Sequence, residues 1–116
     1  MNGKRETTRS VLCVTLFLRR MITMYALFCE EIRGEVRLRC YHHYQDELEF
    51  IAHEKMGNLM WWRAWIVNFW EIQNYDDPDL KILSDITISH LRGELPEEEL
   101  CEWGIELQCS WDGTES

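Results

Sequence analysis

Residues 24–40 read MYALFCEEIRGEVRLRC and carry two strand-like patterns on either side of Arg33-Gly34. The first pattern, from Ile22 to Cys29, is a mostly apolar run, which is consistent with a buried strand. The second, from Glu35 to Tyr41, alternates apolar and polar residues, as a half-buried strand does. Because Arg33-Gly34 suits a turn, the two patterns together predict a β-hairpin.

Helical spacing begins at Asp46, where apolar residues start to recur three and four positions apart. Gly57-Asn58 is expected to break or kink this helix. Beyond it, Trp61 and Trp65 stand one helical turn apart on a second apolar stripe, which predicts a buried helix or a helix with a binding face. A strand from Met60 to Ile72 is the less favoured alternative. The main stripe consists of Leu48, Ile51, Ala52, Met56, Leu59, Trp62, Ile66 and Phe69.

The last third of the chain predicts two further helical segments and a closing strand. Asp77 and Pro78 are typical of an N-cap and a first helical residue, and Gly93 fits the position just after the end of that helix. A short helical turn from Pro96 to Trp103 follows, and Gly104 ends it. The final stretch alternates, with one predicted face made of Ile105, Leu107, Cys109 and Trp111.

This order predicts a small α+β fold with an antiparallel sheet, formed by the N-terminal hairpin and the C-terminal strand, and two or three helices packed on one face. The length of 116 residues fits a single domain, which we place at residues 24–116. Residues 1–23 carry five basic residues and one acidic residue. We interpret them as a basic leader foreign to the domain, with translation starting at Met21 or Met24; an extra strand or a membrane-surface segment are the alternatives. Their apolar run, Val11 to Leu18, is too short to span a bilayer.

The charge distribution predicts the kind of partner. The chain has a net charge of −9, and residues 71–116 contain thirteen acidic and two basic residues. A field of this sign repels phosphate backbones and anionic lipid, so it disfavours nucleic acid and membranes and favours a basic protein. Charge that only keeps a Trp-rich domain soluble is an equal alternative. The acidic residues predicted to contact a partner are Asp76, Asp77, Asp79, Glu97, Glu98, Glu99 and Glu102.

Trp61 and Trp65 are the predicted aromatic anchors of such an interface. Tryptophans at helical spacing belong to the core more often than to a contact surface. If these two are exposed, however, they would be natural binding anchors, because tryptophan is enriched among the residues that dominate binding energy.

No catalytic or metal-binding motif is complete, so we expect no enzyme, no metal and no cofactor. His53-Glu54 begins an H-E-x-x-H zinc motif, but Gly57 stands where the second histidine is required. Cys40, His42 and His43 are close in sequence, yet Cys40 is expected to face the core, away from at least one of the two histidines. Asp79 resembles part of a nuclease site only superficially, because it falls in the first turn of a predicted helix.

The five cysteines, at positions 13, 29, 40, 101 and 109, include no C-x-x-C pair. Their odd number and spacing show no secretory disulfide framework, which predicts reduced thiols and a cytoplasmic location. Cys29, Cys101 and Cys109 lie in acidic stretches, and neighbouring negative charge raises the pKa of a thiol, so a cysteine nucleophile is not expected.

Several stretches resemble a family of small acidic proteins from the early regions of lambdoid phages. The resemblance rests on the opening hairpin at 24–40, on Asn68-Phe69-Trp70, on a middle helix and on the closing stretch 104–113. It covers most of the chain after Met24 and departs in the basic leader and in a longer segment before Trp70. It implies a phage accessory protein that acts on a host or phage component.

These features favour a non-enzymatic binding protein that modulates or inhibits a basic, DNA-binding protein, for example as a DNA mimic. One alternative is a small acidic secretion-type chaperone, which would form a homodimer. Another is a single-stranded nucleic-acid-binding protein, which would use the hairpin face of Arg33, Arg37, Arg39 and Tyr41 for charge and stacking.

Overall fold

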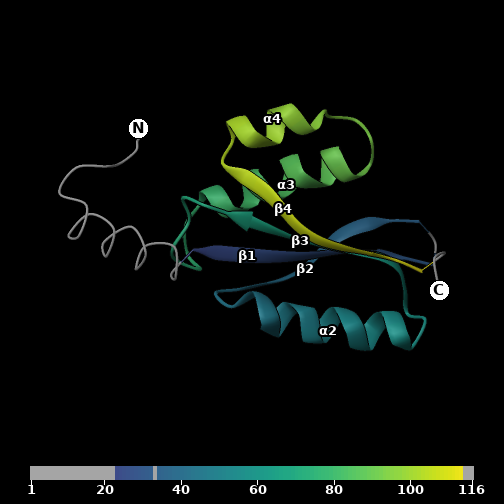
Figure 1. Ribbon diagram of the computed structural model, residues 1–116. Helices are drawn as coiled ribbons and strands as arrows, with labels where there is room; N and C mark the ends of the chain where they lie inside the picture. Colours follow the sequence, from purple (N-terminus) through teal and green to yellow (C-terminus); the bar gives the residue numbers. More distant parts are fainter. Residues whose placement is uncertain (1–22, 33, 114–116) are drawn as a thin grey trace, which may run out of the picture.

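The computed structural model describes residues 23–32 and 34–113. Four strands form one antiparallel sheet in the order β2-β1-β3-β4, so β1 and β3 are central (Figure 1). This confirms the predicted small α+β fold, in which the hairpin and the C-terminal strand share a sheet. The predicted leader, apart from Thr23, lies outside the described residues. The elements are β1 (Met24–Glu31), β2 (Val36–His42), α2 (Gln45–Gly57), β3 (Trp61–Phe69), α3 (Asp79–Leu91), α4 (Glu97–Glu102) and β4 (Ile105–Asp112).

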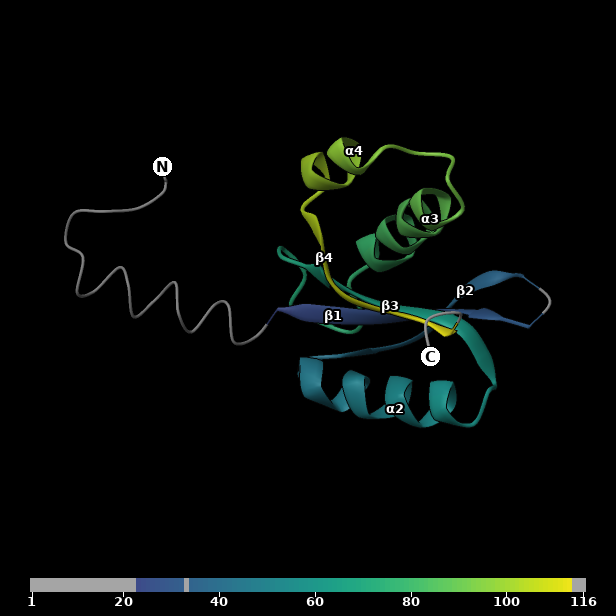
Figure 2. The same cartoon turned by 45° about the vertical axis from the view of Figure 1, so that its right-hand side comes forward.

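The helices are divided between the two faces of the sheet, instead of packing on one face as the pattern suggests. Helix α2 covers one face, and α3 and α4 cover the other (Figures 1 and 2). The strand β1 shows why both faces need cover: Leu27 packs in the cluster on the α2 side, whereas Phe28 packs in the cluster with α3 and α4, and both are fully buried. Alternate residues of a central strand face opposite layers, so both sets must be apolar.

Residues 61–69 form strand β3, so the prediction of a helix there is wrong and the less favoured strand alternative is right. Every residue from Ala64 to Phe69 is buried. A strand covered on both faces reads as a continuous apolar run and loses the alternation that identifies a strand in sequence. Its aromatic and β-branched residues also favour strand over helix. The predicted break is confirmed, because α2 ends at Gly57.

A register shift in β4 also corrects the predicted single apolar face. Leu107 pairs with Val67, but Cys109, two residues later, pairs with Ile66. Such a bulge moves all following side chains to the other face. Ile105 therefore packs with α3 and α4, whereas Cys109 and Trp111 pack on the α2 side.

Helix α3 follows its sequence pattern closely. The Asp77 side chain accepts a hydrogen bond from the backbone N–H of Asp79 at 2.8 Å, so Asp77 satisfies a backbone donor at the start of the helix as expected, although α3 begins at Asp79, one residue later than predicted. Gly93 has a φ of 83°, the left-handed conformation expected just after a helix end. The buried residues of the helix are Leu80, Leu83, Ser84 and Thr87, which lie on one face. Within the described residues, no helix has the length and apolar character needed to cross a membrane.

Candidate partner-binding site

The layer formed by α3, α4 and their connections carries an excess of negative charge. Residues 73–103 hold nine acidic and two basic side chains. Both basic side chains are already engaged: Lys81 Nζ lies 3.2 Å from Asp85, and Arg92 Nε lies 3.5 Å from Glu94. The other seven carboxylates make no ion pair with any described residue. They are the predicted set, Asp76, Asp77, Asp79, Glu97, Glu98, Glu99 and Glu102.

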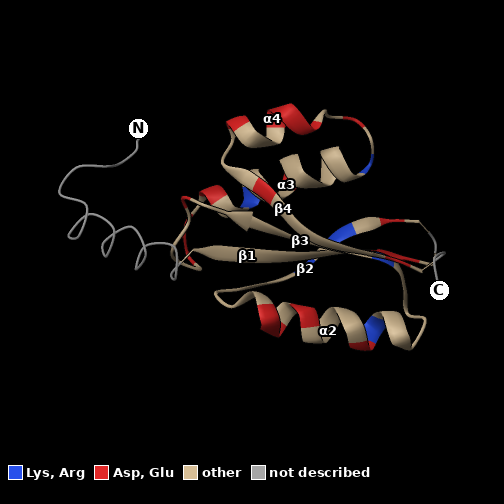
Figure 3. Ribbon diagram, viewed as in Figure 1, with Lys and Arg blue, Asp and Glu red and all other residues tan. Residues whose placement is uncertain are grey.

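These seven carboxylates lie in one layer of the molecule. Helices α3 and α4 pack on the same side of the sheet, and Figure 3 shows acidic residues along α4 and at the start of α3. Asp77 and Glu99 are half-buried, and the other five residues are exposed. We name this layer the acidic layer, and it is defined by the seven residues above.

Trp61 and Trp65, which are predicted to anchor a partner if exposed, do not meet this condition. Their exposed fractions are 5% and 8%, so both belong to the core. The exposed tryptophans are instead Trp62 (47%), Trp70 (37%) and Trp103 (48%). The helical assignment puts Trp62 on the buried stripe, whereas in a strand the neighbours Trp61 and Trp62 point to opposite faces, and here Trp61 is the buried one.

Two of the exposed tryptophans lie beside the acidic layer. Trp103 follows Glu102 directly at the end of α4. The backbone N–H of Trp70 donates to the carbonyl of Gly104 at 3.0 Å, and its indole N–H donates to Glu106 at 2.7 Å. The end of α4 therefore combines exposed aromatic rings with exposed carboxylates, which is a suitable chemistry for contacting a protein that carries Arg or Lys.

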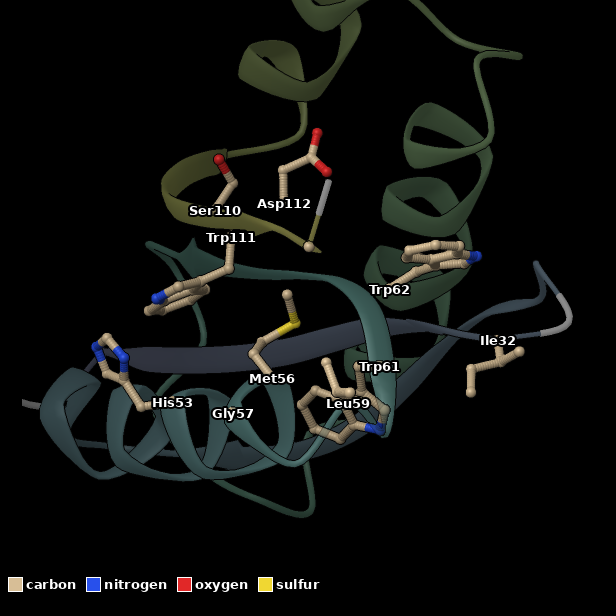
Figure 4. A pocket seen from close by; sticks show the side chains of 11 residues that line it. Ile32, His53, Met56, Gly57, Leu59, Trp61, Trp62, Ser110, Trp111 and Asp112 are labelled. Carbon is tan, nitrogen blue, oxygen red and sulfur yellow. The ribbon is translucent and has the colours of Figure 1, made fainter. Parts of the chain in front are cut away.

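A separate cavity of about 750 Å³ lies where the end of α2, the start of β3 and the end of β4 meet. Figure 4 shows His53 and Trp111 at one end of it, with Met56 between them and Trp61. The ring of His53 packs edge-on against Trp111, with the ring centroids 5.4 Å apart. The full lining consists of Ile32, His53, Met56, Gly57, Leu59, Trp61, Trp62, Ser110, Trp111, Asp112 and Gly113.

Two of the hairpin side chains proposed for nucleic-acid contact, Arg37 and Tyr41, are engaged within the protein, whereas Arg39 is exposed and makes no ion pair with a described residue. Arg37 lies 3.6 Å from the carboxylate of Glu31. The hydroxyl of Tyr41 forms a 2.7 Å hydrogen bond with that of Ser84, and its half-buried ring packs against the core. Arg33 lies outside the described residues. Among the described residues of this set, Arg39 alone is a cation outside an ion pair, and the Tyr41 ring is not available for stacking, whereas binding of single-stranded nucleic acid combines several cations with stacked aromatic rings.

The histidines and cysteines serve local structure. His42 accepts the backbone N–H of Tyr44 at 3.0 Å, and His43 lies 3.1 Å from the carbonyl of Thr23. Burial raises the pKa of the Cys29 thiol to about 11, and burial also raises the pKa of Cys40. Such thiols are protonated at neutral pH and are poor nucleophiles. In the described part of the chain, no three His, Cys, Asp or Glu side chains are grouped to hold a metal ion.

Comparison of this chain with protein families, with curated proteins and with solved structures finds no match. The resemblance to lambdoid-phage accessory proteins therefore stays a prediction. The acidic layer and the cavity are two features of the surface that the packing of the core does not explain.

Proposed function

We propose that this protein is a non-enzymatic, cytoplasmic binding protein that uses its acidic layer to bind a basic protein and to modulate or inhibit it. The observation that carries the proposal is the set of seven carboxylates in one layer, none of them in an ion pair with a described residue. Charge of one sign on one face steers an oppositely charged partner and fixes its orientation.

Helix stabilisation explains only some of these carboxylates. Asp77 caps α3, and Glu97, Glu98 and Glu99 lie in the first turn of α4, where negative charge is favourable. Glu102 lies in the last turn of α4, where negative charge is unfavourable and where no basic residue accompanies it. The position of Glu102 therefore supports a role in partner binding and not in helix stability.

The class of partner follows from the sign and density of this charge. DNA-binding proteins present basic surfaces that are adapted to closely spaced phosphates. A layer of carboxylates can occupy such a surface and exclude DNA from it. This mode of action, a DNA mimic in a phage or mobile-element accessory protein, is the form of the proposal that we favour.

A matched pair of triple substitutions tests the acidic layer. The variant Glu97→Gln, Glu98→Gln, Glu102→Gln removes three exposed charges from α4, and the control Asp46→Asn, Glu47→Gln, Glu54→Gln removes three exposed charges from α2, on the opposite face. Each protein serves as bait in nuclease-treated lysate at low and high salt, with mass spectrometry of the captured proteins.

We expect the unmodified chain and the α2 control to recover the same basic protein at low salt and to lose it at high salt, because salt screens exposed charges. The α4 variant should fail to recover it. Equal loss in both variants would mean that net charge, and not this layer, attracts the partner. Recovery of no basic protein by the unmodified chain would contradict the proposal for the cell tested.

A further inference from the structure

The cavity between α2, β3 and β4 has the size and composition of a binding pocket. Its volume of about 750 Å³ falls inside the range of roughly 300–1,000 Å³ that is typical of ligand pockets. Trp61, Trp62 and Trp111 line it together with Met56, an adaptable apolar side chain. Tryptophan supplies large contact area, so these walls suit a bulky apolar group.

Leu59 lies at the rim of this cavity, directly after the end of α2. It is the one non-glycine residue of the described chain with a positive φ, 59°, and 78% of its surface is exposed. A left-handed conformation is unfavourable for leucine, and an exposed side chain gains little burial in return. The turn is fixed by backbone hydrogen bonds from Leu59 to Met56 and from Met60 to Lys55. These two bonds form the usual left-handed end of a helix, and they hold an apolar side chain at the rim of the cavity, at a position where glycine is more common.

The negative charge around the cavity determines which apolar ligands it can attract. The lining contains Asp112 but no Lys or Arg. A smaller adjoining hollow shares Trp62 and Asp112 with the cavity and adds Glu30 and Arg63, which are paired with each other. The described residues together carry six basic and nineteen acidic side chains, a net charge of −13. An apolar group that is flanked by positive charges is complementary to this site, and one flanked by negative charges is repelled.

We propose that the cavity receives a bulky apolar side chain, such as Phe or Leu, from a basic segment of a partner protein. The positive charge of that partner rests on the proposed function, whereas the apolar anchor rests on the cavity alone. The cavity lies on the α2 side of the sheet and the acidic layer on the other side, so the net negative charge of the molecule, and not the acidic layer itself, would attract the basic segment to the cavity.

Four ligands and the full chain test the anchor by fluorescence anisotropy. The probe is a fluorescein-labelled peptide, Lys-Arg-Lys-Phe-Lys-Arg-Lys. The two comparison peptides have Ala in place of Phe, or Glu in place of every Lys and Arg. Unlabelled N-acetyl-phenylalaninamide is the competitor. We expect the Phe peptide to bind about tenfold more tightly than the Ala peptide, since a buried Phe side chain contributes at least that much. The Glu-flanked peptide should not bind.

Variants of the rim complete the test. Leu59→Asn removes the apolar side chain but suits the left-handed conformation. Gly57→Leu adds a side chain at a position with open space around its Cβ atom. Both should reduce the preference for Phe over Ala to near unity. Phe50→Gln, which removes a comparably exposed (70%) apolar residue outside the cavity, should leave the preference unchanged.

The other possible outcomes would contradict the apolar anchor, the binding of basic partners, or the peptide as occupant. Equal, salt-sensitive binding of the Phe and Ala peptides would overturn the anchor and leave the acidic binding function standing. Binding of neither basic peptide would overturn both. Displacement of the Phe peptide by N-acetyl-phenylalaninamide at equal concentration would identify a small-molecule pocket and overturn a peptide occupant. An undiminished preference for Phe in Leu59→Asn and Gly57→Leu would also overturn the anchor.

Discussion

At the scale of one residue, the backbone conformation of Leu59 lowers the stability of the fold beside the cavity. A left-handed conformation costs a leucine about 1–2 kcal/mol, and Leu59 is 78% exposed. Leu59→Asn should therefore raise the free energy of unfolding by about 1 kcal/mol, since Asn adopts this conformation more readily. Urea denaturation followed by circular dichroism measures the change. The control Phe50→Gln should shift stability by less than about 0.5 kcal/mol. A loss of stability in Leu59→Asn would mean that its side chain packs more than its exposure indicates.

The cysteine thiols give a second prediction at this scale. Burial raises the pKa of Cys29 from 9.0 to about 11, whereas Cys101 is exposed. A raised thiol pKa means that the folded state holds its proton more tightly, so this contribution to stability is complete below pH 9 and is lost as the pH rises through 11. At pH 8, iodoacetamide should alkylate Cys101 well before Cys29, as peptide mapping by mass spectrometry would show. Equal rates without denaturant would contradict the burial of Cys29, and equal rates in urea are the control.

At the scale of elements, the two ends of α4 separate helix stability from function. Glu97 lies in the first turn and Glu102 in the last, and both are exposed. Glu102→Lys replaces an unfavourable charge by a favourable one, and Glu97→Lys does the reverse, with an identical change in net charge. We expect Glu102→Lys to be more stable to urea than Glu97→Lys by about 0.5–1 kcal/mol. Equal stabilities would mean that the dipole of this short helix is too weak to matter, and would remove the argument that Glu102 is retained for binding.

The elements also differ in how well their sequences predict them. Helix α3 could be predicted because one face is buried and the caps are local, so a 3.6-residue period and the residues Asp77 and Gly93 suffice. Strand β3 could not, because it is buried on both faces and shows no alternation. The mistaken helix then misplaced Trp61 and Trp65. The seven carboxylates of the acidic layer could be predicted, since they lie in two short stretches of sequence. The cavity could not, because its walls come from segments that only the sheet brings together.

At the scale of the whole molecule, like charges concentrated on one side work against the folded state. The described residues have a net charge of −13, of which −7 lies within residues 73–103. Self-repulsion of this kind destabilises a compact protein, and salt screens it over a Debye length of roughly 10 Å at 0.1 M. We therefore expect the melting temperature to rise with NaCl concentration, although the same salt weakens binding to a basic partner.

The two triple variants turn this expectation into a comparison. The α4 variant (Glu97→Gln, Glu98→Gln, Glu102→Gln) removes charge from the crowded layer, whereas the α2 variant (Asp46→Asn, Glu47→Gln, Glu54→Gln) removes the same charge from the other face. Melting followed by circular dichroism in a NaCl series should show a smaller salt dependence for the α4 variant than for the α2 variant. Equal slopes would mean that repulsion is spread over the whole surface. A smaller slope of melting temperature against NaCl concentration in the α4 variant would mean that carboxylates of the acidic layer repel one another and destabilise the fold. A basic partner bound to the same layer would then relieve this repulsion.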